Sequence, residues 1–247
     1  QTELADRLGV SLKHINQVVN GPASISAELA LGLEKVFGAS AGFWLSRESL
    51  YRADLARLQE ARELDRFQSW ARTFPIKQLK HHDFLPSDAK GTELVAALLG
   101  FLGIASPEEW RDPSAVFRKP QRFASDSAAL SAWLRVGEIR AQRIDCAPYD
   151  EDRFRRVLWE ARSLTRLPPR EWEPRLVELC ASAGVAVVIF PELKGARANG
   201  AMRWLSPTKA LIQLSLRYRW EDVLWYSFFH EGGHVVLHRP ASPIGIR

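Results

Sequence analysis

Residues 220–239 read WEDVLWYSFFHEGGHVVLHR, and this stretch has the apolar pattern of a buried helix. At its centre is HEGGH, in which His230 and His234 stand four positions apart. Side chains at that spacing project from the same face of a helix, so both imidazoles can reach one metal ion. The spacing therefore predicts that His230 and His234 bind Zn²⁺. The alternative is a pair of buried histidines whose nitrogens are satisfied by hydrogen bonds.

Glu231 follows the first histidine directly and is turned about 100° around the helix from it. A carboxylate at that position can act as general base toward a water activated by the zinc. Gly232 and Gly233 each cost about 1 kcal/mol relative to alanine in a helix interior. Because glycine permits close approach, we expect another backbone or a substrate to pack against them. The motif therefore predicts a zinc-dependent peptidase with Glu231 as the catalytic base.

The residues before this motif change from helical to strand-like periodicity. The helical patterns are DEDRFRRVLWEARSLTRL at 150–167 and PREWEPRLVELCASAG at 169–184; the strand-like runs are GVAVVIFPEL at 184–193, GAMRWL at 200–205 and KALIQLSL at 209–216. Residues 149–247 are therefore predicted to form an α+β domain with a small sheet and a histidine helix. We expect a substrate peptide to add as a strand beside residues 209–216.

This order of elements resembles the ImmA/IrrE family of metallopeptidases, and RYRWEDVLWYSFFHEGGHVVLH is similar to the central motif of that family. The resemblance covers about residues 149–247. It implies a zincin-like fold, a zinc ion, and cleavage of a protein such as a DNA-binding repressor. It also implies a third zinc ligand, a Glu on a later helix.

No Asp or Glu follows Glu231 in the chain, so the third ligand is expected beyond Arg247, where SPIGIR looks like the start of a loop. The other readings are a substituted ligand or a protein that binds no metal. His238, four residues after His234, is a candidate substitute, although about 80° of rotation from His230 favours a supporting role. Glu192 is a weaker candidate.

The opening QTELADRLGVSLKHINQVVNG predicts two short amphipathic helices that cross at a tight corner. Leu4, Ala5 and Leu8 form the apolar stripe of the first helix, and Ile15, Val18 and Val19 form that of the second. Gly9 suits a left-handed turn, and Ser11 is a suitable N-cap. The polar residues of the second helix are predicted to contact DNA together with its cap: Ser11, Lys13, His14, Asn16 and Gln17.

These spacings resemble the XRE/Cro family of helix-turn-helix domains. The continuation NGPASISAELALGLEKVFGASAGFWLSRESL is similar to the HigA-like antitoxin branch, with a helix at about 26–37 and a Phe43-Trp44-Leu45 anchor. The resemblance covers residues 1 to about 60 and lacks the first helix of the family. It implies double-stranded operator DNA as partner and a homodimer. A helical corner with no DNA role is the alternative.

Residues 61–148 show helical patterns but no catalytic constellation. A charged helix is predicted at 51–74, ended by Pro75, with further helices at 91–103 and 125–144. His81 and His82 are adjacent, so they are expected to point apart as surface residues.

Composition limits the remaining choices. The net charge is +5, but the first sixty residues carry six Lys/Arg against seven Asp/Glu, so any DNA contact there must be local. The two cysteines, Cys146 and Cys180, fit a reducing cytoplasm, and no apolar run is long enough to span a membrane.

Together these patterns predict a mostly helical α+β protein of the cytoplasm with three parts. Residues 1–60 form a helix-turn-helix bundle, residues 61–148 a helical middle region, and residues 149–247 a zincin-like domain with an apparently incomplete C-terminus. The predicted function is a DNA-binding regulator with a zinc endopeptidase acting on a repressor or other regulator. The rival is a non-catalytic regulator or HigA-like antitoxin with a degenerate peptidase domain, which binds a partner protein.

Overall fold

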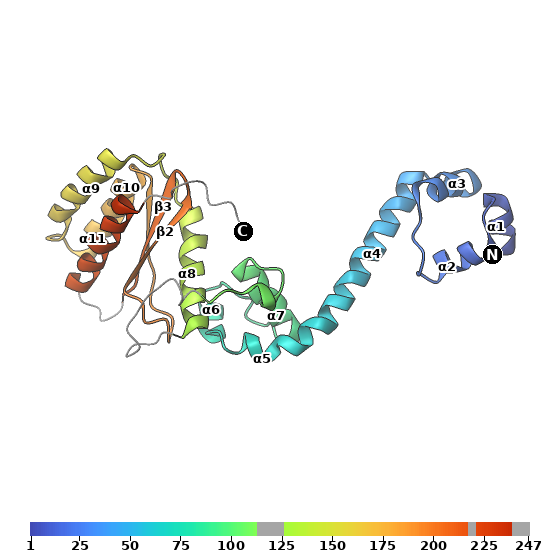
Figure 1. The fold of residues 1–247 in the computed structure, drawn as a ribbon, viewed down its shortest axis with the longest axis horizontal. Coiled ribbons are helices and arrows are strands. Elements are labelled where there is room, and N and C mark those ends of the chain that lie inside the picture. The colour runs from blue at the N-terminus through green and yellow to red at the C-terminus, as the bar shows by residue number, and fades with distance from the viewer. Residues whose placement is uncertain (113–125, 217–220, 239–247) are drawn as a thin grey trace. The chain divides into compact units, whose positions relative to one another are not determined.

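The computed structural model describes residues 1–112, 126–216 and 221–238, and the chain divides into two compact units (Figure 1). Unit 1 comprises residues 1–66 and unit 2 comprises residues 67–247. Trp220 and Arg239 of the histidine-helix stretch, and the SPIGIR segment, lie outside the described residues. Within the described ranges, no helix combines the length and apolarity needed to cross a membrane.

The helix ends of unit 1 include the predicted signals Gly9 and Ser11, and Ser26 and Ser40 are two further caps that the structure adds. Gly9 ends the first helix with φ 66°, and the hydroxyls of Ser11, Ser26 and Ser40 accept backbone N–H groups at the next three N-termini. The helices are α1 (Thr2–Leu8), α2 (Leu12–Val19), α3 (Ala27–Phe37) and α4 (Ala41–Leu64).

A small core holds these helices together. Ala5 of α1 and Ile15 of α2 are buried, as predicted, and they share the core with Leu29, Ala30 and Leu33 of α3. Val19 instead is 59% exposed. The predicted Phe43-Trp44-Leu45 anchor is reduced to Trp44, whose indole packs against Phe37. The reason is that three consecutive residues of a helix point in different directions and cannot all face one core.

The charged helix predicted at 51–74 is α4 of unit 1, and it begins and ends earlier than predicted. α4 starts at Ala41, because Ser40 caps it, and it ends at Leu64 before a 3₁₀ turn at Asp65–Phe67. Unit 2 continues with α5 (Gln68–Ala71), α6 (Ile76–His81), α7 (Gly91–Leu102), a 3₁₀ turn (Pro107–Glu109) and α8 (Ser127–Gln142). The helix α6 was not predicted.

A three-stranded sheet forms the centre of unit 2, with β3 between β1 and β2. The strands are β1 (Val185–Ile189), β2 (Gly200–Ser206) and β3 (Lys209–Leu214). β1 runs parallel to β3, whereas β2 runs antiparallel to it. The expected substrate position beside residues 209–216 is therefore wrong, because β3 already has a strand on each side. Among the described residues, β2 is an edge strand.

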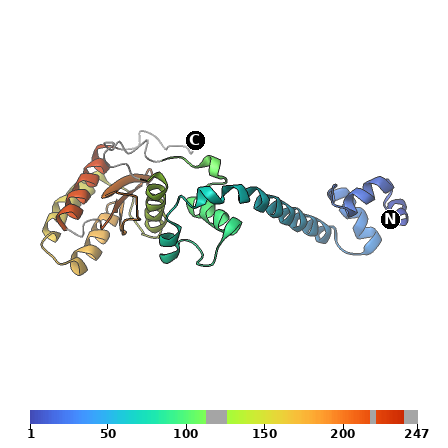
Figure 2. The same cartoon turned by 90° about the horizontal axis from the view of Figure 1, so that it is seen from below.

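Helices cover both faces of this sheet, as the two views of unit 2 show (Figures 1 and 2). α9 (Glu151–Leu164), α10 (Pro169–Ala181) and α11 (Glu221–Leu237) lie on one face, and α8 lies on the other. Burial on both faces explains why GVAVVIF is an unbroken apolar run. α8, predicted as part of a middle region, packs against β1 and β3 and thus belongs to the same layered unit.

Candidate metal centre and DNA interface

The helix α11 carries HEGGH and runs alongside the edge strand β2. Trp225 and Phe228 of α11 are buried in the core shared with α9, α10 and the sheet. Two further contacts fix the helix along the strand. The Glu231 side chain lies over Gly200, and the Trp204 indole donates a 2.8 Å hydrogen bond to the backbone carbonyl of His238. The histidines are consequently held next to the edge of the sheet.

His230 and His234 come together as the spacing predicts. Their Nε2 atoms are 3.2 Å apart. Two nitrogens that each lie about 2.0–2.1 Å from a tetrahedral zinc ion are roughly 3.3 Å apart. The separation of the two nitrogens therefore suits a shared zinc ion, and it equally suits the alternative, a hydrogen bond between the two rings.

The surroundings of the two rings differ. His230 is exposed and stacks on the Tyr226 ring, with 6.0 Å between ring centroids. Burial lowers the pKa of His234 below its ordinary value, and the nearby His230 and His238 lower it further. The neutral form of His234 is therefore favoured, and the neutral imidazole is the form that binds metals.

Among the described residues, no group of three His, Cys, Asp or Glu side chains could hold a metal ion. His238 stacks on His234, with 5.1 Å between ring centroids, and its supporting role stays a prediction. Glu192, after β1, accepts a hydrogen bond from the backbone N–H of Arg197. His81 and His82, in the helix α6 and at its C-cap, are likewise not part of any such group.

The two glycines of HEGGH have different neighbours. A Cβ atom on Gly232 would lie 2.8 Å from Leu158 Cδ2 of α9, so this glycine permits the close crossing of α9 and α11. A Cβ atom on Gly233 would meet no atom within 4 Å. The close neighbour of Gly232 is therefore a leucine side chain and not a backbone, and the approach of a substrate to Gly233 stays a prediction.

Two residues that position the site were not identified from the sequence. Gly200 makes room for Glu231, since a Cβ there would lie 3.0 Å from Glu231 Cγ. Trp204 binds the C-terminal end of α11. Nothing in the local sequence of β2 indicates either role, because both depend on where α11 packs.

In unit 1, the predicted DNA-contacting residues lie on and beside α2. Lys13 and Gln17 are exposed one turn apart, whereas His14 and Asn16 are half-buried. Ser11 is engaged as the cap of α2 through the backbone N–H of His14, at 3.1 Å. Lys13 and Gln17 are consequently the side chains with the most freedom to reach a base or a phosphate.

Comparison with known proteins bears on unit 1. A family model described as helix-turn-helix matches residues 1–44. No curated protein and no solved structure matches the chain. The matched residues contain α1, α2 and α3, so the helix-turn-helix predicted at the start of the chain is confirmed, and the chain begins with a domain of the DNA-binding regulator type.

Proposed function

We propose that this DNA-binding regulator carries a zinc-dependent endopeptidase in unit 2. The observation that supports the enzyme is the 3.2 Å separation of His230 Nε2 and His234 Nε2 beside Glu231. A zinc ion held by these nitrogens supplies Lewis-acid polarisation of a carbonyl and a water of lowered pKa. The third ligand comes from outside the described residues.

Glu231 performs the proton transfer in this proposal. It lies between the histidines in sequence and its side chain extends over Gly200, toward the edge of the sheet. The carboxylate accepts a proton from the attacking water and passes it to the leaving amine of the scissile peptide. Gly200 and Trp204 are positioning residues, because they set where α11 and Glu231 lie relative to β2.

The substrate is proposed to bind as an extended segment along β2. An edge strand has backbone N–H and C=O groups that can pair with a peptide, whereas the central strand β3 has none to spare. α11 runs along β2 from Glu231 at Gly200 to His238 at Trp204. A peptide paired with β2 therefore passes the histidines.

The proposal is tested by metal content and proteolysis of the full-length protein. We expect near-stoichiometric zinc and zinc-dependent cleavage of a peptide library, read by mass spectrometry. Glu231→Gln should keep the zinc and reduce the cleavage rate by about 10²–10⁴-fold, since glutamine cannot accept the proton. His230→Ala should lose the zinc. A protein without zinc, or a fully active Glu231→Gln variant, would favour the non-catalytic regulator or antitoxin.

For unit 1 we propose that a homodimer reads an inverted repeat in operator DNA. Helix-turn-helix proteins usually read two half-sites about one helical turn apart, which requires two copies. α4 exposes Leu50, Tyr51 and Leu58, with exposures of 59%, 47% and 63%. These side chains, with the half-buried Leu55, give α4 an apolar surface that a second copy of α4 can cover.

Salt-dependent DNA binding tests the roles of the exposed residues of α2. Gln17→Ala should relax sequence preference by about 1–3 kcal/mol at a contacted base pair. Lys13→Ala should weaken binding to all DNA sequences alike. It should also reduce the slope of log affinity against log salt concentration by about 0.9, as expected for one phosphate contact. A gel shift with the native promoter at several salt concentrations measures both. Absence of a retarded band at every salt concentration would make the corner a protein-interaction element.

A further inference from the structure

A pocket of about 210 Å³ lies on the face of the sheet opposite α11. Its walls come from the end of α7, the turn after it, α8 and β2, and they include Leu102, Trp110, Leu134, Arg135, Glu138 and Arg203. A water molecule occupies about 30 Å³ of liquid volume, so the pocket has room for roughly seven water-sized groups. It is thus large enough for a small organic molecule.

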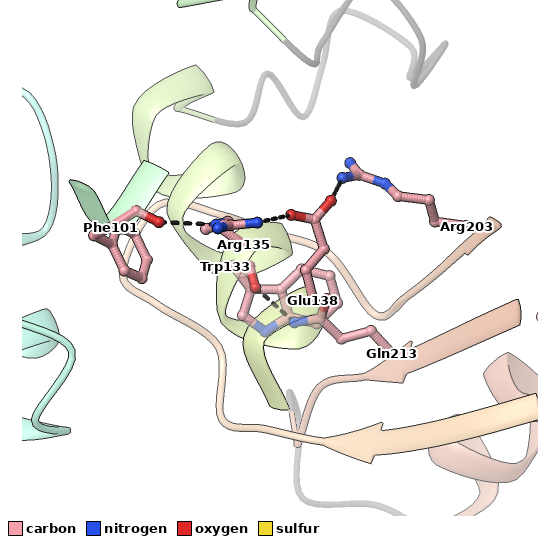
Figure 3. A network of polar contacts seen from close by, with 6 residues as sticks. All are labelled: Phe101, Trp133, Arg135, Glu138, Arg203 and Gln213. Atoms are coloured by element: carbon pink, nitrogen blue, oxygen red, sulfur yellow. Dashed lines mark hydrogen bonds and ion pairs between the residues drawn. The ribbon is translucent and has the colours of Figure 1, made fainter. Parts of the chain in front are cut away.

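Two arginines share one carboxylate at this pocket (Figure 3). Arg135 Nη1 is 2.8 Å from Glu138 Oε2, and Arg203 contacts the other oxygen of the same carboxylate. Arg135 is also held by its Nε–H, which donates to the Phe101 carbonyl at 2.8 Å. The two guanidinium groups and the single carboxylate leave one positive charge.

Among the described residues that line the pocket, no further charge offsets this positive charge. Glu109 and Arg111 also line the pocket, and their charges oppose each other. Burial lowers the pKa of Arg203, and the positive charge of Arg135 lowers it further. The side chains of Arg203 and Arg135 are 41% and 26% exposed, so an anion from solution can reach both guanidinium groups and pair with the remaining positive charge.

One wall of the pocket is apolar and is held in place. The Trp110 indole N–H donates to Ser131 Oγ at 3.1 Å, which fixes the ring, and Leu102 and Leu134 complete the apolar wall. A site with a cationic end and an apolar wall recognises an amphipathic ligand.

We infer that this pocket binds a small organic anion, whose carboxylate or phosphate group pairs with Arg203 and Arg135 while its apolar part lies against Trp110. A guanidinium has several N–H donors, and Glu138 engages only Nη1 of each arginine in the ion pairs described above. Both arginines therefore keep donors for a ligand. The inference does not depend on zinc, because the pocket and α11 lie on opposite faces of the sheet.

Isothermal titration calorimetry of the full-length protein with phenyl phosphate, benzoate and inorganic phosphate tests this inference. We expect one phenyl phosphate per chain, bound about tenfold more tightly than inorganic phosphate because its ring covers Trp110. Benzoate shows whether a carboxylate suffices. Arg203→Gln should weaken phenyl phosphate at least tenfold, and Arg203→Lys should weaken it less, since the charge remains.

The informative variant is Glu138→Gln. If the pocket takes an anion, removal of the competing carboxylate frees both arginines, and phenyl phosphate should bind several-fold more tightly. Arg143→Ala, at the exposed C-cap of the same helix, is the matched control and should leave binding unchanged. No binding of any probe at millimolar concentration would overturn the inference. The inference would also be overturned if Arg143→Ala and Arg203→Gln weakened phenyl phosphate binding equally, or if a folded Glu138→Gln variant bound phenyl phosphate more weakly than the parent.

Discussion

Units 1 and 2 bury their apolar side chains to very different extents. Of the thirteen large apolar side chains that are exposed in the described residues, nine belong to residues 1–66, including Phe37, Phe43 and Leu50. Most of the buried apolar residues belong to unit 2, where the sheet is covered on both faces. Unit 2 is therefore stabilised by its own core, whereas unit 1 has apolar surface that a partner can cover.

The difference also separates the two kinds of site. The candidate metal centre of unit 2 is fixed by buried neighbours, since Phe228 is fully buried two positions before His230. The candidate DNA residues of unit 1 stand on an eight-residue helix with Ile15 as its buried residue. A catalytic site needs side chains that are fixed by buried neighbours, whereas a surface that adapts to DNA can stand on a short helix with one buried residue.

The largest expected effect is on the free energy of unfolding, and it is seen when one phenylalanine in each unit is replaced by alanine. Phe228→Ala should lower the free energy of unfolding of unit 2 by about 3–5 kcal/mol, because Phe228 is fully buried. Phe43→Ala should cost less than about 1 kcal/mol, since that ring is half exposed. Urea unfolding followed by circular dichroism measures both. Equal losses would remove the contrast between the units.

The second prediction concerns the apolar surface of α4. Leu50→Glu with Leu58→Glu places two carboxylates where a second copy is proposed to pack, and should weaken dimerisation by about 100-fold, or about 2.7 kcal/mol. Sedimentation equilibrium measures the change. The matched control is Glu60→Lys on the same helix, which alters charge without apolar area. If the doubly substituted protein dimerises like the parent, α4 is not the interface.

The third prediction compares neighbouring glycines in α11. Gly232→Ala should leave unit 2 about 1 kcal/mol less stable than Gly233→Ala does, because the new methyl group must displace the end of the Leu158 side chain. Gly233→Ala should stabilise it by up to about 1 kcal/mol, since that position is open and alanine favours a helix. Thermal unfolding of the two variants compares them directly. A destabilised Gly233→Ala variant would show that α11 is packed differently.

Local sequence signals predicted much of this arrangement. Gly9 marks a helix end through its backbone freedom and Ser11 marks one through its side-chain hydroxyl, so the corner of unit 1 could be located before the structure. The histidine pair follows from helical periodicity alone. The order of the strands could not be predicted. An apolar run such as KALIQLSL indicates a buried strand, but it does not record which strands pair with it. Gly200 and Trp204 act through the packing of a distant helix, which no local pattern records.

The smallest effect is a difference in thiol reactivity, and it measures how firmly the core of unit 2 is closed. Burial raises the pKa of Cys180 far above its usual range, and Cys180 is fully buried in the core formed by α9, α10, α11 and the sheet. Cys146 is partly exposed, and its pKa is raised less strongly, mainly by burial with Asp145 adding and Lys209 opposing. A raised pKa leaves less thiolate at a given pH, so both thiols should react more slowly with iodoacetamide than a free cysteine, and raising the pH should speed the reaction of Cys146.

Cys180 should react only when the unit unfolds, so its rate should follow urea concentration while that of Cys146 does not. Mass spectrometry of the alkylated peptides separates the two residues, with Cys146→Ser as the control for cross-labelling. Rapid labelling of Cys180 in the folded protein would mean that the core beneath α11 opens without unfolding, and the rigid support assigned to the histidines would then be absent.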